Sequence, residues 1–166
     1  ETASPQVIKQ LTHTLTTGTD VPRLGGMLVG LGGNNGTTFT AGILANQKGQ
    51  SWETKRGIEH PNFYGSFTQC ATAHVGFRRD EKTGSLSDVY KPVNSLLPMV
   101  KPTDFVISGW DISSTNLFEA TKRAHVLEPT LVNALRPELE GIIPLRAVVN
   151  QRFIAANQSD RIDNVV

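Results

Sequence analysis

The order of apolar and polar positions along the chain predicts strands that alternate with helices. A short apolar strand is expected at residues 23–29 and a second one at 105–108. Between them, residues 37–46 carry Phe39, Ile43 and Leu44 at helical spacing, which is typical of a helix that packs on a sheet. Because strands that alternate with helices favour a parallel sheet, the pattern predicts an α/β fold with flanking helices.

The remaining segments give weaker signals. Residues 1–20 are rich in Ser and Thr and predict an irregular or edge-strand approach to the fold. The other expected elements are loops or short helical pieces at 47–64, a strand at 66–76, an exposed turn or loop at 78–88, helices at 116–127 and 130–139, and strands at 147–149 and 153–156.

The glycine-rich run at residues 30–38 (GLGGNNGTT) follows the first strand and opens the first helix. Glycines allow tight turns and a close approach of a ligand to the backbone, and the N–H groups of a first helical turn attract anions. In the dinucleotide pattern G-x-G-x-x-G, Gly30 and Gly32 match, whereas Asn35 takes the third position and Gly36 follows it. The run therefore predicts a cradle for a diphosphate, and a plain turn is the alternative. A P-loop is excluded because no Gly-Lys-Ser/Thr follows.

A second candidate is Asp111, which closes the apolar strand after residue 104 and precedes a predicted helix. In dinucleotide folds, an acid at this place accepts hydrogen bonds from the adenosine ribose and repels a 2′-phosphate, which favours NAD over NADP. The expected interval from the glycines is about 20 residues, and Asp111 lies far beyond that. Residues from about 47 to 103 would then form an inserted excursion. The spacing leaves an alternative open, namely that Asp111 caps the next helix.

Composition narrows the function classes. The 166 residues suit one domain or part of a larger one, and 16 basic and 15 acidic residues nearly balance, so no nucleic-acid partner is expected. No apolar segment approaches the roughly 20 residues of a membrane span, so no membrane partner is expected either. One cysteine excludes an internal disulfide, and four scattered histidines give little support for a metal site. We expect a cytoplasmic location, and we expect the chain to be part of a longer protein.

The sequence resembles the eukaryotic-type myo-inositol-1-phosphate synthase family, also called inositol-3-phosphate synthase. Agreement extends from about residue 21 to the last residue. The blocks that agree, in order, are LVGLGGNNGTT at 28–38, NFYGSFTQ at 62–69, LLPMV at 96–100, SGWDI at 108–112 and FIAANQ at 153–158.

This resemblance implies an NAD-binding, Rossmann-like domain over residues 21–166 that is incomplete because the chain stops early, with residues 1–20 outside it. In the family, a glycine–asparagine turn holds the diphosphate of NAD, and the aspartate of the Gly-Trp-Asp block contacts the adenosine ribose. The implied cofactor-binding positions are Gly30, Gly32, Gly33, Asn34, Asn35, Asp111, Ala147, Val148, Gln158 and Arg161.

The resemblance also implies an activity. Family members convert glucose 6-phosphate to myo-inositol phosphate by oxidation, enolisation, intramolecular aldol cyclisation and reduction, a step of inositol and phospholipid biosynthesis. Their catalytic residues lie in a downstream domain that also forms a homotetramer, and none of their motifs occurs in this chain. We therefore assign no catalytic residue and expect this chain alone to be inactive. The alternative is a truncated, non-catalytic form that binds NAD or regulates the enzyme.

Overall fold

A computed structural model describes residues 12–166, with the side chains of residues 67, 68, 151 and 156 outside the description. The expectation for residues 1–20 falls largely outside the described residues, and residues 12–20 contain no helix or strand.

The centre of the fold is a three-stranded parallel sheet in the order β1 (Gly25–Val29), β6 (Val106–Asp111), β7 (Leu145–Arg146). In the register of β1 and β6, Val29 pairs with Trp110, so the two strands end side by side. One isolated bridge, between Ala147 and Val165, extends the sheet beyond β7. The prediction of a parallel, Rossmann-like α/β fold is confirmed.

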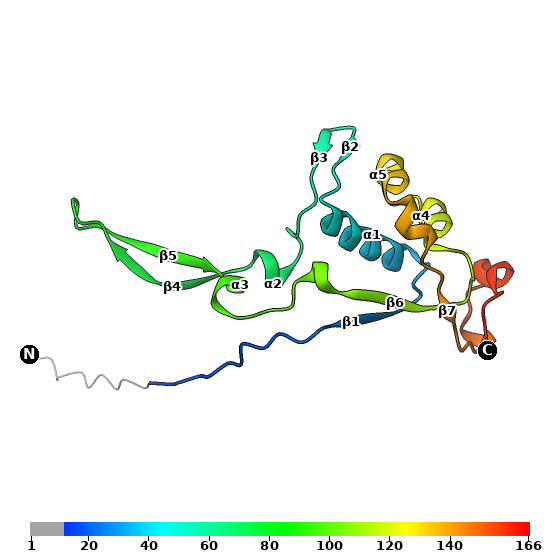
Figure 1. Cartoon of the computed structure of the whole chain (residues 1–166), viewed down its shortest axis with the longest axis horizontal. Helices are drawn as coiled ribbons and strands as arrows, with labels where there is room; N and C mark the ends of the chain where they lie inside the picture. Colours follow the sequence, from blue (N-terminus) through cyan, green and yellow to red (C-terminus); the bar gives the residue numbers. More distant parts are fainter. Residues whose placement is uncertain (1–11) are drawn as a thin grey trace, which may run out of the picture.

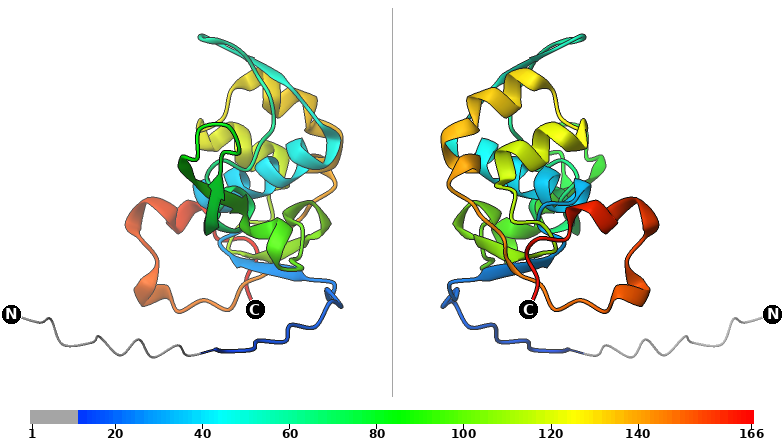
Figure 2. Two further views of the ribbon diagram at one scale, coloured as in Figure 1. Left: turned by 90° about the vertical axis from the view of Figure 1, so that its left-hand side faces the viewer. Right: turned by 90° about the vertical axis from the view of Figure 1, so that its right-hand side faces the viewer.

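The helices cover one side of this sheet. They are α1 (Asn34–Lys48), α4 (Leu117–Ala124), α5 (Pro129–Ala134) and α6 (Arg136–Glu140), and Figure 1 and Figure 2 show α1, α4 and α5 above the strands. Their buried residues form the core, to which Leu28 and Ile107 of the sheet contribute. The opposite face of the sheet carries Val29, Val106 and Trp110, all exposed. Among the helices of residues 12–166, none is long and apolar enough to cross a membrane.

Between α1 and β6 the chain makes an excursion from the central sheet. It contains the hairpin β2 (Trp52–Thr54) and β3 (Gly57–Glu59), the short helix α2 (Phe67–Cys70), the hairpin β4 (Thr72–Arg79) and β5 (Leu86–Pro92), the short helix α3 (Val93–Leu96) and a 3₁₀ turn at Pro102–Asp104. The β4–β5 hairpin projects away from the sheet and helices (Figure 1).

Several predicted elements are wrong in detail. The segment 47–64 contains the β2–β3 hairpin instead of loops, because strands of three residues are too short to show alternation. The strand expected at 66–76 begins only at Thr72, and the turn expected at 78–88 is narrower, since β5 begins at Leu86.

The carboxyl-terminal third of the chain also differs from the prediction in the bounds of its elements. The helix expected at 130–139 is divided into α5 and α6, because Pro137 has no N–H to donate to a continuous helix. The last strands were also misplaced. Pairing with β6 occurs at Leu145–Arg146, Ala147 makes only a bridge, and 3₁₀ turns occupy Gln151–Phe153 and Ala156–Arg161.

The packing of β1 on β6 depends on a glycine. A Cβ on Gly109 would lie 2.2 Å from the Leu28 carbonyl oxygen, which is far inside van der Waals contact. We expect Gly109→Ala to unfold or strongly destabilise the protein, as measured by thermal unfolding. The control is Gly42→Ala in α1, where an added Cβ meets nothing within 4 Å. It should stabilise the protein by roughly 0.5–1 kcal/mol because alanine is the better helix former. Equal melting temperatures for the two variants would contradict this account.

Candidate functional site

The glycine turn joins β1 to α1 through backbone contacts. The N–H groups of Gly30 and Leu31 both donate to the Trp110 carbonyl, at 2.8 and 3.1 Å, and the Gly33 N–H donates to the Gly30 carbonyl at 3.0 Å. Gly30 has a φ of 80°, a backbone conformation that favours glycine. Leu31 is fully buried and anchors the turn in the core. The turn is therefore held rigidly against the end of β6.

Gly36 explains why the glycine pattern is displaced by one position. A Cβ on this residue would lie 2.4 Å from the Leu31 carbonyl oxygen and 2.8 Å from that of Gly30. Only glycine lets the first turn of α1 approach the preceding loop so closely, which is the packing role of the third glycine in a dinucleotide fingerprint. The replacement of that glycine by Asn35 is thus compensated one residue later.

Asp111 lies at the end of β6, is 9% exposed, and faces the glycine turn. Its Oδ2 accepts the Gly32 N–H at 2.7 Å, and its Oδ1 accepts the Ser113 N–H at 3.1 Å. A Cβ on Gly32 would lie only 3.2 Å from Oδ2. The cap of α4 is Asn116, whose Oδ1 accepts the Glu119 N–H at 3.0 Å. The helix-cap interpretation of Asp111 is therefore wrong.

A pocket of about 290 Å³ opens where β1 and β6 end. Most of the predicted cofactor residues line it, although they come from distant parts of the sequence. The predicted residues among its lining are Gly30, Gly32, Gly33, Asp111, Ala147, Val148, Gln158 and Arg161. Ligands of open parallel sheets bind at this edge, where the strands have their carboxyl ends.

Asn34 and Asn35 do not line the pocket. They are exposed at the start of α1, next to Gly33. The Gly32 and Gly33 N–H groups already have acceptors within the protein. Among the described residues, no acceptor lies in hydrogen-bond range of the N–H groups of Asn34, Asn35 and Gly36, as is usual for the first turn of a helix. These three donors are available to an anion.

Sequence reasoning missed other residues of the pocket. They are Val29, Trp110, Ile112, Ser113, Arg123 and Val149. Arg123 is the most informative of them because it adds a second cation beside Arg161. The only signal that could have found it is its place on the helix that follows Asp111. Within the described residues, no group of three or more His, Cys, Asp or Glu is placed to bind a metal ion.

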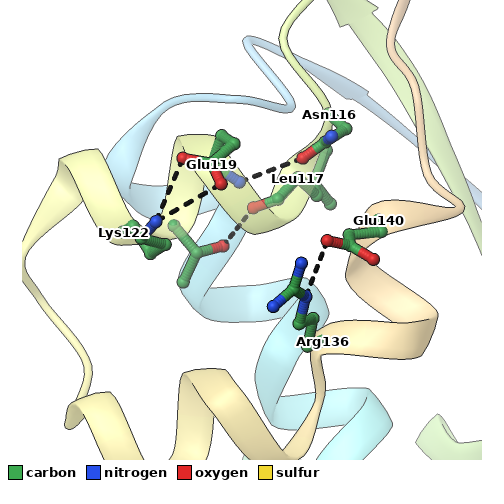
Figure 3. A network of polar contacts seen from close by, with 7 residues as sticks. Asn116, Leu117, Glu119, Lys122, Arg136 and Glu140 are labelled. Atoms are coloured by element: carbon green, nitrogen blue, oxygen red, sulfur yellow. Dashed lines mark hydrogen bonds and ion pairs between the residues drawn. The ribbon is translucent and has the colours of Figure 1, made fainter.

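Polar contacts fix the helix that carries Arg123. Figure 3 shows Asn116 at the start of α4 and Lys122 reaching back to Glu119, with their charged groups 3.3 Å apart. On α6, Arg136 and Glu140 pair at 2.7 Å, and the Arg136 guanidinium also lies 5.0 Å from the Phe118 ring centre. The exposed pairs lie within single helices and each contributes little free energy, whereas the Arg136–Phe118 contact joins α6 to α4.

The loop after Asp111 is fixed from the solvent side by Asp163. The Ser114 N–H and hydroxyl both donate to its carboxylate, at 2.7 and 2.8 Å. These two bonds hold the pKa of the Asp163 carboxyl below its usual value, the backbone N–H having the larger effect. Asp163, which does not itself line the pocket, therefore holds the loop that follows Asp111.

Comparisons with known proteins agree with this geometry. The family model for myo-inositol-1-phosphate synthase, whose matching part is the NAD-binding domain, matches residues 24–166. The chain belongs to the myo-inositol-1-phosphate synthase family. It is 49% identical over 158 residues to inositol-3-phosphate synthase 1 of Oryza sativa subsp. japonica, with 95% of this chain and 30% of that protein covered. Isozyme 1 of Arabidopsis thaliana is 47% identical over the same length, with the same coverage.

A solved structure supports the same assignment. The crystal structure of inositol-3-phosphate synthase from Caenorhabditis elegans superposes with a TM-score of 0.81 at 45% identity, and covers 89% of this chain and 28% of that chain. The chain thus corresponds to the NAD-binding domain of inositol-3-phosphate synthase and spans about 30% of the length of its curated relatives. NAD is the cofactor of this domain.

The Asp163 contact predicts a pH effect. A group whose pKa is lower in the folded protein than in the unfolded chain stabilises the fold above its unfolded pKa, and this stabilisation is lost as pH falls through the folded pKa. We expect the Asp163 carboxyl to titrate below ordinary aspartates in a ¹³C NMR titration, with Asp163→Asn assigning the signal. In Ser114→Ala, one of the two donors is lost and the pKa should move back toward the usual value. An Asp163 pKa that is insensitive to Ser114→Ala would contradict the assigned cause.

Proposed function

We propose that the pocket at the ends of β1 and β6 binds NAD, with the adenosine ribose at Asp111 and the diphosphate at the first turn of α1. The observation that carries this proposal is the 2.7 Å bond between the Gly32 N–H and Asp111 Oδ2. It brings the glycine run and the acid into direct contact, and both line the same cavity. The glycine at position 32 also leaves the space that a Cβ would fill.

Asp111 would act as an acceptor that is already oriented. Each carboxylate oxygen takes one backbone N–H and still has a lone pair for a ribose hydroxyl. Because both oxygens are held, the carboxylate needs no reorientation when the ribose arrives. A 2′-phosphate would meet this fixed negative charge, so the site should prefer NAD to NADP.

The diphosphate would meet positive charge on two sides. The open N–H groups of Asn34, Asn35 and Gly36 lie at the positive end of α1. Arg123 and Arg161 line the pocket as side-chain cations. Bound NAD supplies the hydride chemistry, whereas these residues bind and orient it.

For the whole protein, we propose the activity that its family name indicates, the isomerisation of glucose 6-phosphate to myo-inositol phosphate. None of the lysines in residues 12–166 lines the pocket described above, so the acid–base groups that such a reaction requires would come from the rest of the protein. On this proposal the 166 residues bind NAD but do not catalyse the reaction alone, with residues 21–166 as the domain. A cytoplasmic location and a homotetramer stay predictions.

The ribose assignment can be tested at Asp111. Asp111→Asn should weaken NAD binding by about 1–3 kcal/mol, because a charged hydrogen-bond partner is lost, and should narrow the preference for NAD over NADP. The measurement is calorimetric titration of the intact protein with both dinucleotides. Asp104→Asn is the matched control, since Asp104 is exposed at the opposite end of β6. Unchanged NAD affinity in Asp111→Asn would remove the ribose role.

The diphosphate assignment can be tested by removing a single N–H group. Asn34 is the first residue of α1, where proline is tolerated, and Gly33 has φ −78° and ψ 172°, which suits a residue before proline. We expect Asn34→Pro to fold and to bind NAD about tenfold or more weakly, as loss of a hydrogen bond to a charged group predicts.

Two alanine variants complete this test. Asn34→Ala keeps the N–H, so it should bind more tightly than Asn34→Pro. The double variant Asn34→Ala, Asn35→Ala measures what the side chains add. If Asn34→Pro and Asn34→Ala bind NAD with equal affinity, the diphosphate does not bind at the Asn34 N–H.

A further inference from the structure

The last residues of the chain fold back against the pocket. The N–H groups of Asp163 and Asn164 both donate to the Ile112 carbonyl, at 3.1 and 2.9 Å. The Ala147 N–H donates to the Asn164 carbonyl at 3.0 Å, and the Val166 N–H donates to the Ala147 carbonyl at 3.1 Å. The carboxyl terminus accordingly lies beside β7 in Figure 1. Residues 163–166 thus extend the sheet at the edge where the pocket opens.

The Asn164 side chain ties two strands together. It is 8% exposed, and its Nδ2 donates to the carbonyls of Asp111, Leu145 and Pro144 at 3.0, 3.1 and 3.2 Å. A side-chain amide has two hydrogens, so at least one of them is shared between two carbonyls. The acceptors lie at the end of β6 and at the start of β7. Asn164 therefore fixes the backbone of Asp111 relative to the neighbouring strand.

The Asp163 side chain holds the same region from outside. Its carboxylate accepts two bonds from Ser114, and the adjacent Ser113 N–H donates to Asp111 Oδ1. A continuous path of contacts runs from Asp163 through the 112–114 loop to Asp111 and Gly32. Neither Asp163 nor Asn164 is among the described residues that line the pocket.

We propose that Asp163 and Asn164 are positioning residues, which form a clasp that sets the orientation of Asp111 for the adenosine end of NAD. This inference rests on the proposed function of the pocket. The Ser113 N–H is one of only two donors on the Asp111 carboxylate among the described residues, so its place decides where the carboxylate points. The loop that carries this donor follows β6 directly, and the Asp163 carboxylate holds it through Ser114.

The clasp predicts a loss of affinity without a matching loss of stability. Asp163 is exposed, so its truncation leaves no cavity in the core. A merely structural contact would change the melting temperature and leave NAD affinity intact, whereas a positioning contact lowers NAD affinity even where the melting temperature changes little. Asn164 is buried and its amide serves three carbonyls, so its removal would disturb the fold and Asp163 is the better position to change.

The experiment compares Asp163→Ala, Asp163→Asn and the control Asp160→Ala in the intact protein. Asp160 is exposed in the 3₁₀ turn just before the clasp. Titrations with NAD and with ADP-ribose, together with melting temperatures, are the readouts. We expect Asp163→Ala to bind both ligands about tenfold more weakly. Asp163→Asn should bind with intermediate affinity because it keeps one acceptor oxygen, and the control should match the wild type.

A double-mutant cycle tests whether Asp163 acts through Asp111. In the Asp111→Asn background, Asp163→Ala should lower NAD affinity by clearly less than tenfold, because the effects of substitutions within one network are not additive. Full additivity would overturn the proposal, as would unchanged affinity in Asp163→Ala. If the wild-type protein binds NAD and the Asp163 variants bind it with the same affinity, the clasp proposal alone is wrong. If the wild-type protein binds neither ligand, the proposed function is wrong, and the clasp proposal, which rests on it, is wrong as well.

Discussion

The hydrogen bond from the Gly32 N–H to the Asp111 carboxylate is the contact on which the rest of the site depends. It joins the turn after β1 to the end of β6, two segments separated by the whole excursion. It can form only because β1 and β6 are adjacent and parallel and their ends are in register. Glycines at positions 36 and 109 allow the backbones to approach closely enough, since a Cβ at either position would overlap a carbonyl oxygen.

The pocket that contains this contact is lined by groups of both charges. One carboxylate is held at the glycine turn, the cations Arg123 and Arg161 also line the cavity, and the open N–H groups lie at the start of α1. A dinucleotide presents neutral ribose hydroxyls at one end and a negative diphosphate in its middle. The pocket offers an acceptor for the first and donors for the second, which is why the NAD-binding function of the family and the geometry of this chain agree.

The excursion lies outside this site, and the exposed face of the sheet reaches the pocket only through Val29 and Trp110 among the described residues. The core is built mainly between the helices, and the face of β1 and β6 that points away from them carries exposed Val29, Val106 and Trp110. The β4–β5 hairpin also exposes large side chains, Phe77 and Tyr90 among them. The chain spans about 30% of the length of its curated relatives.

The sequence by itself determined the elements that have a strong local pattern. The first strand, the glycine turn, α1 and the second strand are visible because apolar spacing and glycines are local properties. Short elements were missed or misplaced, as with β2, β3 and the 3₁₀ turns, because a few residues carry too little periodicity. Even in α1 the pattern was incomplete, since Phe39 was expected to pack and is 44% exposed.

Tertiary structure alone decided which residues meet. An acid after a strand suits a helix cap and a ribose contact equally well, and only the fold shows that Asn116 is the cap and that Asp111 faces Gly32. Arg123 and the Asp163–Asn164 clasp have no local signature, because their contacts join segments that are far apart in sequence. Local pattern specifies backbone conformation, whereas a binding site depends on distances between strands and loops that only the packed chain defines.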